Sequence, residues 1–125
     1  MSRNALISLL LTLVAGGCLP RGSTAKLNSP NARERAVAGV ALASGGDRAA
    51  AHRLVPLLED ADSAVRMMAI LSLERLTGET LGYRYFDTES RRAEAVERWR
   101  TALREGRFEA TGGGGAAAAS AAGAE

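Results

Sequence analysis

The chain has 125 residues, enough for one domain, and its 16 basic and 14 acidic side chains leave a formal net charge of +2. A dedicated nucleic-acid binder needs a strongly basic surface, so this balance excludes nucleic acid as the expected partner. Cys18 is the only cysteine in the sequence, which rules out an internal disulfide and a cysteine-based metal cluster. We therefore expect a small domain without a metal or a cofactor.

The N-terminus carries an apolar run that is too short to cross a membrane. Residues 1–4 are polar with one arginine, and residues 5–15 are apolar, whereas a spanning helix needs about 20 residues. The run ends in the small residues 15–17, directly before Cys18. A charged start, a short apolar stretch and small residues at its end indicate an export leader.

The sequence Ala15-Gly16-Gly17-Cys18 resembles the lipobox of bacterial lipoproteins, although Leu is commoner three residues before the cysteine. The resemblance implies that residues 1–17 form a cleaved signal peptide and that Cys18 is acylated, which would anchor the protein to a membrane. Leu19 stands where inner-membrane lipoproteins carry aspartate, which implies the periplasmic face of the outer membrane. The alternative is a general secretory leader whose removal leaves Cys18 as a free thiol.

Two segments of biased composition flank the central part. Residues 18–29 are mostly polar or small and show no period, which is typical of a tether. Residues 109–125 are rich in glycine and alanine and have almost nothing to bury, which predicts a disordered tail. The folded domain is therefore expected at residues 30–108.

The first of four expected helices follows Ser29, which can cap it, and ends at Gly45. Its buried face is predicted to carry Val37, Val40 and Ala41. The second helix is expected at residues 47–59.

Pro56 should kink the second helix, because proline lacks the amide hydrogen that helix interiors need. The third helix is expected between an Asp62 cap and a Gly78 stop. It should be the most buried of the four, because apolar residues cover most of its circumference. Its solvent edge is predicted to lie near Arg66, Ile70 and Glu74.

The fourth helix is expected at residues 88–105, with the Glu94 and Arg98 side chains paired one turn apart. Three of the helices share the pattern Arg-x-x-Ala-(Val/Ile)-x-x-apolar, which begins at Arg33, Arg66 and Arg92 with offsets of 33 and 26 residues. Repeats of this size are typical of stacked helical solenoids. The sequence predicts an all-α fold, a short α-solenoid of about two helical hairpins.

The segment from Leu54 to Leu73 resembles a HEAT repeat of the short kind found in phycobilin lyases. It contains Leu-Leu-x-Asp60, four further residues, and then Val65-Arg66-x-x-Ala, as that family does. The resemblance implies that Asp60 and Arg66 shape the turn between helices and link neighbouring repeats. Asp62 and Val65 belong to the same turn motif as cap and first apolar residue.

Four aromatic residues come late in the domain: Tyr83, Tyr85, Phe86 and Trp99. They could form an exposed surface for a peptide or a glycan, because tyrosine and tryptophan dominate binding hot spots. They could instead cover the open end of the helix stack, with Trp99 as the anchor. We favour the second interpretation.

No set of residues in the sequence has the spacing of a catalytic or metal site. His52 is the only histidine, so a histidine-based dyad or a zinc site lacks partners. We expect a non-catalytic module that docks on a larger protein or on itself, because about three repeats are needed for independent stability. The alternative, which the resemblance to lyase-type HEAT repeats implies, is an accessory subunit or a small-ligand carrier for an enzyme.

Overall fold

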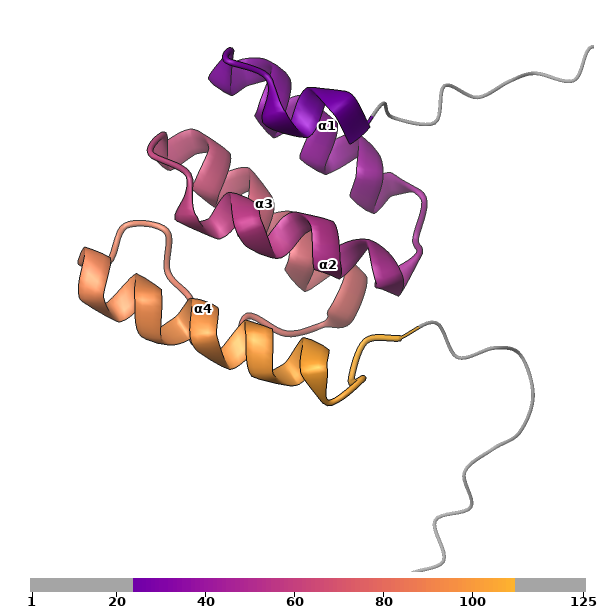
Figure 1. Ribbon diagram of the computed structural model, residues 1–125, viewed down its shortest axis with the longest axis vertical. Coiled ribbons are helices and arrows are strands. Elements are labelled where there is room, and N and C mark those ends of the chain that lie inside the picture. The colour runs from indigo at the N-terminus through magenta and orange to yellow at the C-terminus, as the bar shows by residue number, and fades with distance from the viewer. Residues whose placement is uncertain (1–23, 110–125) are drawn as a thin grey trace, which may run out of the picture.

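The computed structural model describes residues 24–109, and every regular element in that range is helical (Figure 1). The four α-helices are α1 (Ala32–Ser44), α2 (Ala51–Leu54), α3 (Ser63–Thr77) and α4 (Glu89–Arg104). Three 3₁₀ helices complete the fold: η1 (Thr24–Asn28), η2 (Arg48–Ala50) and η3 (Val55–Glu59). The predicted all-α class is confirmed. None of the helices in the described range is long and apolar enough to cross a membrane.

The helices stack side by side, with α1 at one end, α4 at the other, and α2 and α3 between them (Figure 1). α1 packs against both η1 and α3, and η3 packs against both α3 and α4. Each hairpin therefore pairs a 3₁₀ segment with the α-helix that follows it. This arrangement is the short α-solenoid that the sequence pattern predicts.

Both ends of α3 lie where the sequence predicts them. The Asp62 side chain accepts hydrogen bonds from the backbone N–H groups of Ala64 at 2.8 Å and Val65 at 3.2 Å, so two unpaired amides of the first turn are satisfied. The helix ends at Gly78, whose φ of 79° is accessible to glycine without steric cost.

α1 begins two residues later than expected, because Asn31 and not Ser29 is its cap. The Asn31 side chain accepts a hydrogen bond from the backbone N–H of Arg33 at 2.9 Å. The Ser29 hydroxyl accepts from the N–H of Asn31 at 3.1 Å and donates to Glu34 at 2.8 Å. Serine and asparagine cap helices about equally well, so the path of the turn decides between them.

The second expected helix is broken rather than kinked. Residues 48–59 follow a helical path as η2, α2 and η3, and only the four residues of α2 are α-helical. Pro56 lies in the first turn of η3, where its missing amide hydrogen removes the bond that would continue α2. The proline therefore ends the α-helix.

The tandem repeat has a period of 31 residues, not the predicted 33. η1 (24–28) and η3 (55–59) are 31 residues apart, as are the caps Asn31 and Asp62 that follow them. This register aligns Arg66 with Arg35 and not with Arg33. The expected tether is therefore wrong at its end, because η1 lies within residues 18–29 and Leu27 packs against the core.

The buried face of α1 is not the predicted one. Val37 is 62% exposed and Ala41 is exposed, whereas Ala38, Gly39 and Ala43 are buried. A β-carbon at Gly39 would lie only 3.1 Å from a methyl group of Leu57. The neighbouring elements approach α1 closely where its side chains are smallest, and this close packing outweighs the burial of two branched residues.

α3 is the central helix, as predicted, but its solvent edge lies elsewhere. Ile70 is only 6% exposed, whereas Leu71 is 51% exposed. A helix with apolar residues around most of its circumference can place several faces against a core. The positions of α1 and η3 on two sides of α3 select the face that carries Ile70.

The third unit of the stack is incomplete. Residues 78–88 form a loop without a helix, and α4 packs against η3. The expected ion pair between Glu94 and Arg98 is not among those formed within residues 24–109. Arg98 instead donates its Nε–H to the carbonyl oxygen of Leu81 at 2.8 Å, which ties the loop to α4.

The expected signal peptide, the lipidation site at Cys18 and most of the glycine- and alanine-rich tail lie outside the described residues. They stay predictions from the sequence.

Candidate functional site

One arginine stands at the fourth residue of each of the three long helices, namely Arg35 in α1, Arg66 in α3 and Arg92 in α4. In each case the Nη1 group turns back and donates to a carbonyl oxygen in the turn before its own helix. The acceptors are Ser29 at 2.7 Å, Asp60 at 2.8 Å and Asp87 at 2.6 Å. The three inter-helix turns are thus closed by the same kind of contact.

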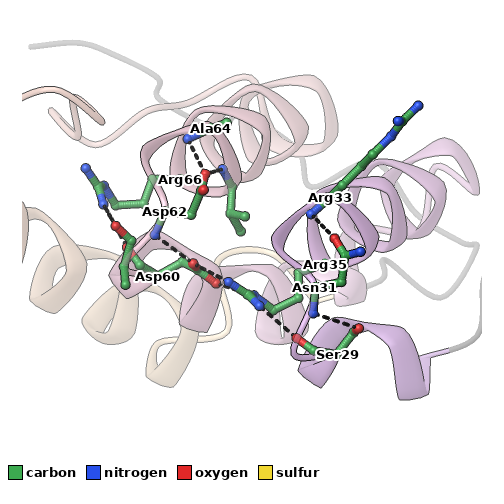
Figure 2. Close-up of polar contacts among 10 residues, drawn as sticks. Ser29, Asn31, Arg33, Arg35, Asp60, Asp62, Ala64 and Arg66 are labelled. Atoms are coloured by element: carbon green, nitrogen blue, oxygen red, sulfur yellow. Dashed lines mark hydrogen bonds and ion pairs between the residues drawn. The ribbon is translucent and has the colours of Figure 1, made fainter.

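Asp60 ties its turn to α1 of the preceding repeat. Arg35 donates its Nε–H to Asp60 Oδ2 at 2.7 Å and its Nη2–H to Oδ1 at 2.9 Å (Figure 2). Oδ1 also accepts the backbone N–H of Asp62 at 2.9 Å. The Asp60 side chain is only 8% exposed and that of Arg35 only 19%, so this two-pronged ion pair is largely shielded from water.

The pair shifts the protonation equilibria of both members. The hydrogen bonds from the Arg35 guanidinium hold the pKa of Asp60 below its ordinary value of 3.8. In return, the hydrogen bond to the Asp60 carboxylate raises the pKa of Arg35. Both groups are therefore charged at neutral pH, and folding favours the ionised carboxylate.

Arg66 continues these contacts towards the next unit. Its Nη1 donates to the carbonyl oxygens of Asp60 and Ala61, and its Nε–H donates to the carbonyl oxygen of Tyr85 at 3.3 Å (Figure 2). Arg35, Asp60 and Arg66 therefore link three successive turns along one edge of the stack. We call these three residues the turn ladder.

Arg35 is the member of the turn ladder that sequence reasoning missed. Its signal is the spacing from a cap, because Arg35 follows Asn31 by four residues and Arg66 follows Asp62 by four. The shared apolar pattern placed Arg33 in that role instead. Val65, which belongs to the same turn motif, is 1% exposed and packs in the core.

Two of the four aromatic residues lie inside the fold, so a binding surface made of all four is wrong. Trp99 is fully buried, and its indole N–H donates to the carbonyl oxygen of Thr80 at 3.0 Å. Tyr83 is 3% exposed, and its hydroxyl donates to the carbonyl oxygen of Leu58 at 2.5 Å. Burial raises the pKa of the Tyr83 phenol, so the group stays neutral and remains a donor.

The other two aromatic residues lie at the surface. Phe86 is 63% exposed and contacts the edge of the half-buried Tyr85 ring, with 5.1 Å between centroids. The Arg84 guanidinium lies 4.7 Å from the centroid of the Phe86 ring. This aromatic edge, Arg84 to Phe86, adjoins the turn ladder, because Arg66 holds the carbonyl group of Tyr85.

The described residues offer little that could enclose a ligand. The better formed of two hollows is open to solvent, has a volume of about 340 Å³, and lies between α4 and the loop before it. Charged side chains such as Glu94 and Arg98 line most of it. Within residues 24–109 no three histidine, cysteine or acidic side chains are arranged to hold a metal ion.

A stack of helical hairpins whose turns are joined by arginine and aspartate side chains defines a helical-repeat protein of the α-solenoid class. Residues 23–84 match the family model of HEAT repeats. The chain therefore contains a small HEAT-repeat domain, as the motif around Asp60 and Arg66 predicts. HEAT repeats are generally scaffolds that bind other proteins.

No significant match was found among the curated proteins or among the solved structures.

Proposed function

We propose that this protein is a lipid-anchored lipoprotein of the bacterial cell envelope whose HEAT-repeat domain is a non-catalytic module for binding another protein. The observation that carries the binding role is the exposed Phe86 on an edge that the turn ladder holds in place. An aromatic side chain that is exposed on a rigid support is the usual centre of a protein-binding hot spot.

The chemistry of the edge suits a protein partner better than a small ligand. Phe86 offers an apolar ring beside the positive charge of Arg84, and no enclosed cavity adjoins it among the hollows of the described range. Small-molecule sites are concave and bury most of their ligand. The open hollows therefore give no support to the alternative role as a small-ligand carrier.

The membrane anchor is supported by the sequence around Cys18. The apolar run of residues 5–15 and the small residues before the cysteine match an acylated leader, and two or more acyl chains give stable anchoring. With this address, the partner is a protein of the envelope, and the periplasmic face of the outer membrane is the proposed site.

The anchor is tested by the intact mass of the protein from the membrane fraction of its native host. We expect a mature chain that begins at Cys18 and carries additional acyl mass, and we expect the Cys18→Ser variant to lose both the acyl mass and the membrane association. A chain that begins at Met1 and is found in the cytosol would contradict the proposal.

The binding role is tested by photo-crosslinking in the same host. A photoreactive residue in place of Phe86 should give adducts of one defined mass with an envelope protein, because this side chain would lie inside the interface. The matched control replaces Leu71, which is 51% exposed but lies on α3, away from the aromatic edge. Equal adduct patterns from the two positions would show that Phe86 marks no specific interface.

A further inference from the structure

The 31-residue register reveals one helix face that lacks the neighbour its counterpart has. On α3, Ser72 is 5% exposed and Met68 is half-buried. Their counterparts on α1, 31 residues earlier, are Ala41, which is exposed, and Val37, which is 62% exposed. α3 has α1 packed against it, whereas α1 is the terminal α-helix of the described stack. Val37 and Ala41 therefore lie where a preceding repeat would pack.

The opposite end of the stack cannot fill this place in another copy of the chain. The outer side of α4 is charged, with ion pairs from Glu97 to Arg104 at 2.9 Å and from Arg100 to Glu59. An apolar helix face gains nothing by covering such a surface, because the charged groups would lose water. Head-to-tail stacking into filaments is thus disfavoured, and a closed two-fold pair is the remaining symmetric arrangement.

We propose that the α1 face, Arg33, Val37, Ala41 and Ser44, pairs with the same face of a second copy in an antiparallel arrangement. A two-fold axis beside Gly39 would place Val37 of each copy opposite Ala41 of the other, so that a branched side chain meets a small one. The inference deepens the proposed binding function by naming a second copy as one partner, but it uses a surface different from Phe86.

Charge complementarity supports the antiparallel arrangement. α1 has no basic residue in its last turn, although the C-terminal end of a helix carries a partial negative charge. In the proposed pair, the exposed Arg33 of each copy lies beside the last turn of the other α1. Each copy would thus supply the positive charge that the other helix end lacks.

Sedimentation equilibrium of the purified full chain tests this interface. A single helix face buries less than a standard interface, so we expect a weak dimer with a dissociation constant on the order of 100 µM. Val37→Glu should raise that constant at least about tenfold, because a carboxylate would be buried without a partner. A chain that is monomeric up to about 1 mM overturns the proposal, since a dimer at that concentration is within reach of even a weak interface.

The matched control is Leu71→Glu, which adds the same charge at an exposed position of α3. It should change the dissociation constant less than about twofold, because surface charges contribute little. Equal effects of the two variants, or association that Val37→Glu leaves unchanged, would also overturn the proposal. Failure of this test leaves the crosslinks from Phe86 intact, so the failures of the two proposals are distinguishable.

Discussion

Replacing Trp99 with alanine is expected to leave most molecules unfolded at room temperature. Trp99 is fully buried, its ring lies 5.3 Å from that of the buried Phe108, and its indole N–H satisfies the carbonyl oxygen of Thr80. A buried tryptophan replaced by alanine costs about 3–5 kcal/mol. A domain of this size has roughly 5 kcal/mol of stability in total, so one substitution removes most of it.

Urea denaturation followed by circular dichroism measures this loss, and Phe86→Ala is its control. Phe86 belongs to the same group of aromatic residues but is 63% exposed, so its replacement should change the free energy of unfolding by less than about 0.5 kcal/mol. Comparable effects of the two substitutions would contradict the separation into a buried anchor and an exposed edge.

Replacing Asp60 with alanine is expected to lower the free energy of unfolding by about 2–3 kcal/mol, because the Arg35 guanidinium loses its charged partner inside the turn. The backbone N–H of Asp62 loses its acceptor as well. Urea denaturation again provides the measurement. The control is Glu97→Ala, which removes an ion-paired carboxylate that is 58% exposed and should have a much smaller effect. Equal losses in the two variants would show that the turn ladder adds no more stability than a surface ion pair.

The same ion pair predicts how stability depends on pH. Because the pKa of Asp60 is lower in the folded protein than its ordinary value of 3.8, the unfolded chain binds the proton more readily at acid pH. The contribution of Asp60 to stability is therefore fully present well above pH 3.8 and is lost as the pH falls through the lowered pKa. Asp60→Asn should flatten this acid limb of the stability profile. An unchanged limb would mean that other carboxylates cause it.

Local signals in the sequence were enough for most helix ends. Asp62 and Gly78 bound α3 as predicted, since a cap and a left-handed glycine act through the backbone of one turn. Pro56 acted where expected, because the missing amide hydrogen needs no tertiary partner. The HEAT-like motif at Asp60 and Arg66 likewise identified the family before the fold was known.

Contacts between repeats could not be predicted in the same way. The pairing of Arg35 with Asp60 joins residues 25 positions apart, and no local pattern marks Arg35 more strongly than Arg33. The two-residue error in the repeat period has the same origin, because a period read from apolar residues ignores where the caps lie. The division of the aromatic residues into buried and exposed pairs also depends on how the loop folds over η3 and α4.

The sequence by itself determined the helical class, the ends of the helices and the residues that shape the central turn, because these depend on contacts within one or two turns. Only the tertiary structure decided which face of α1 is buried. Val37, Val40 and Ala41 are the more obvious apolar set, yet the neighbouring elements approach α1 at Gly39, where a β-carbon would lie 3.1 Å from Leu57. Hydrophobicity can be read along the chain, whereas close approach depends on the shapes of two packed surfaces.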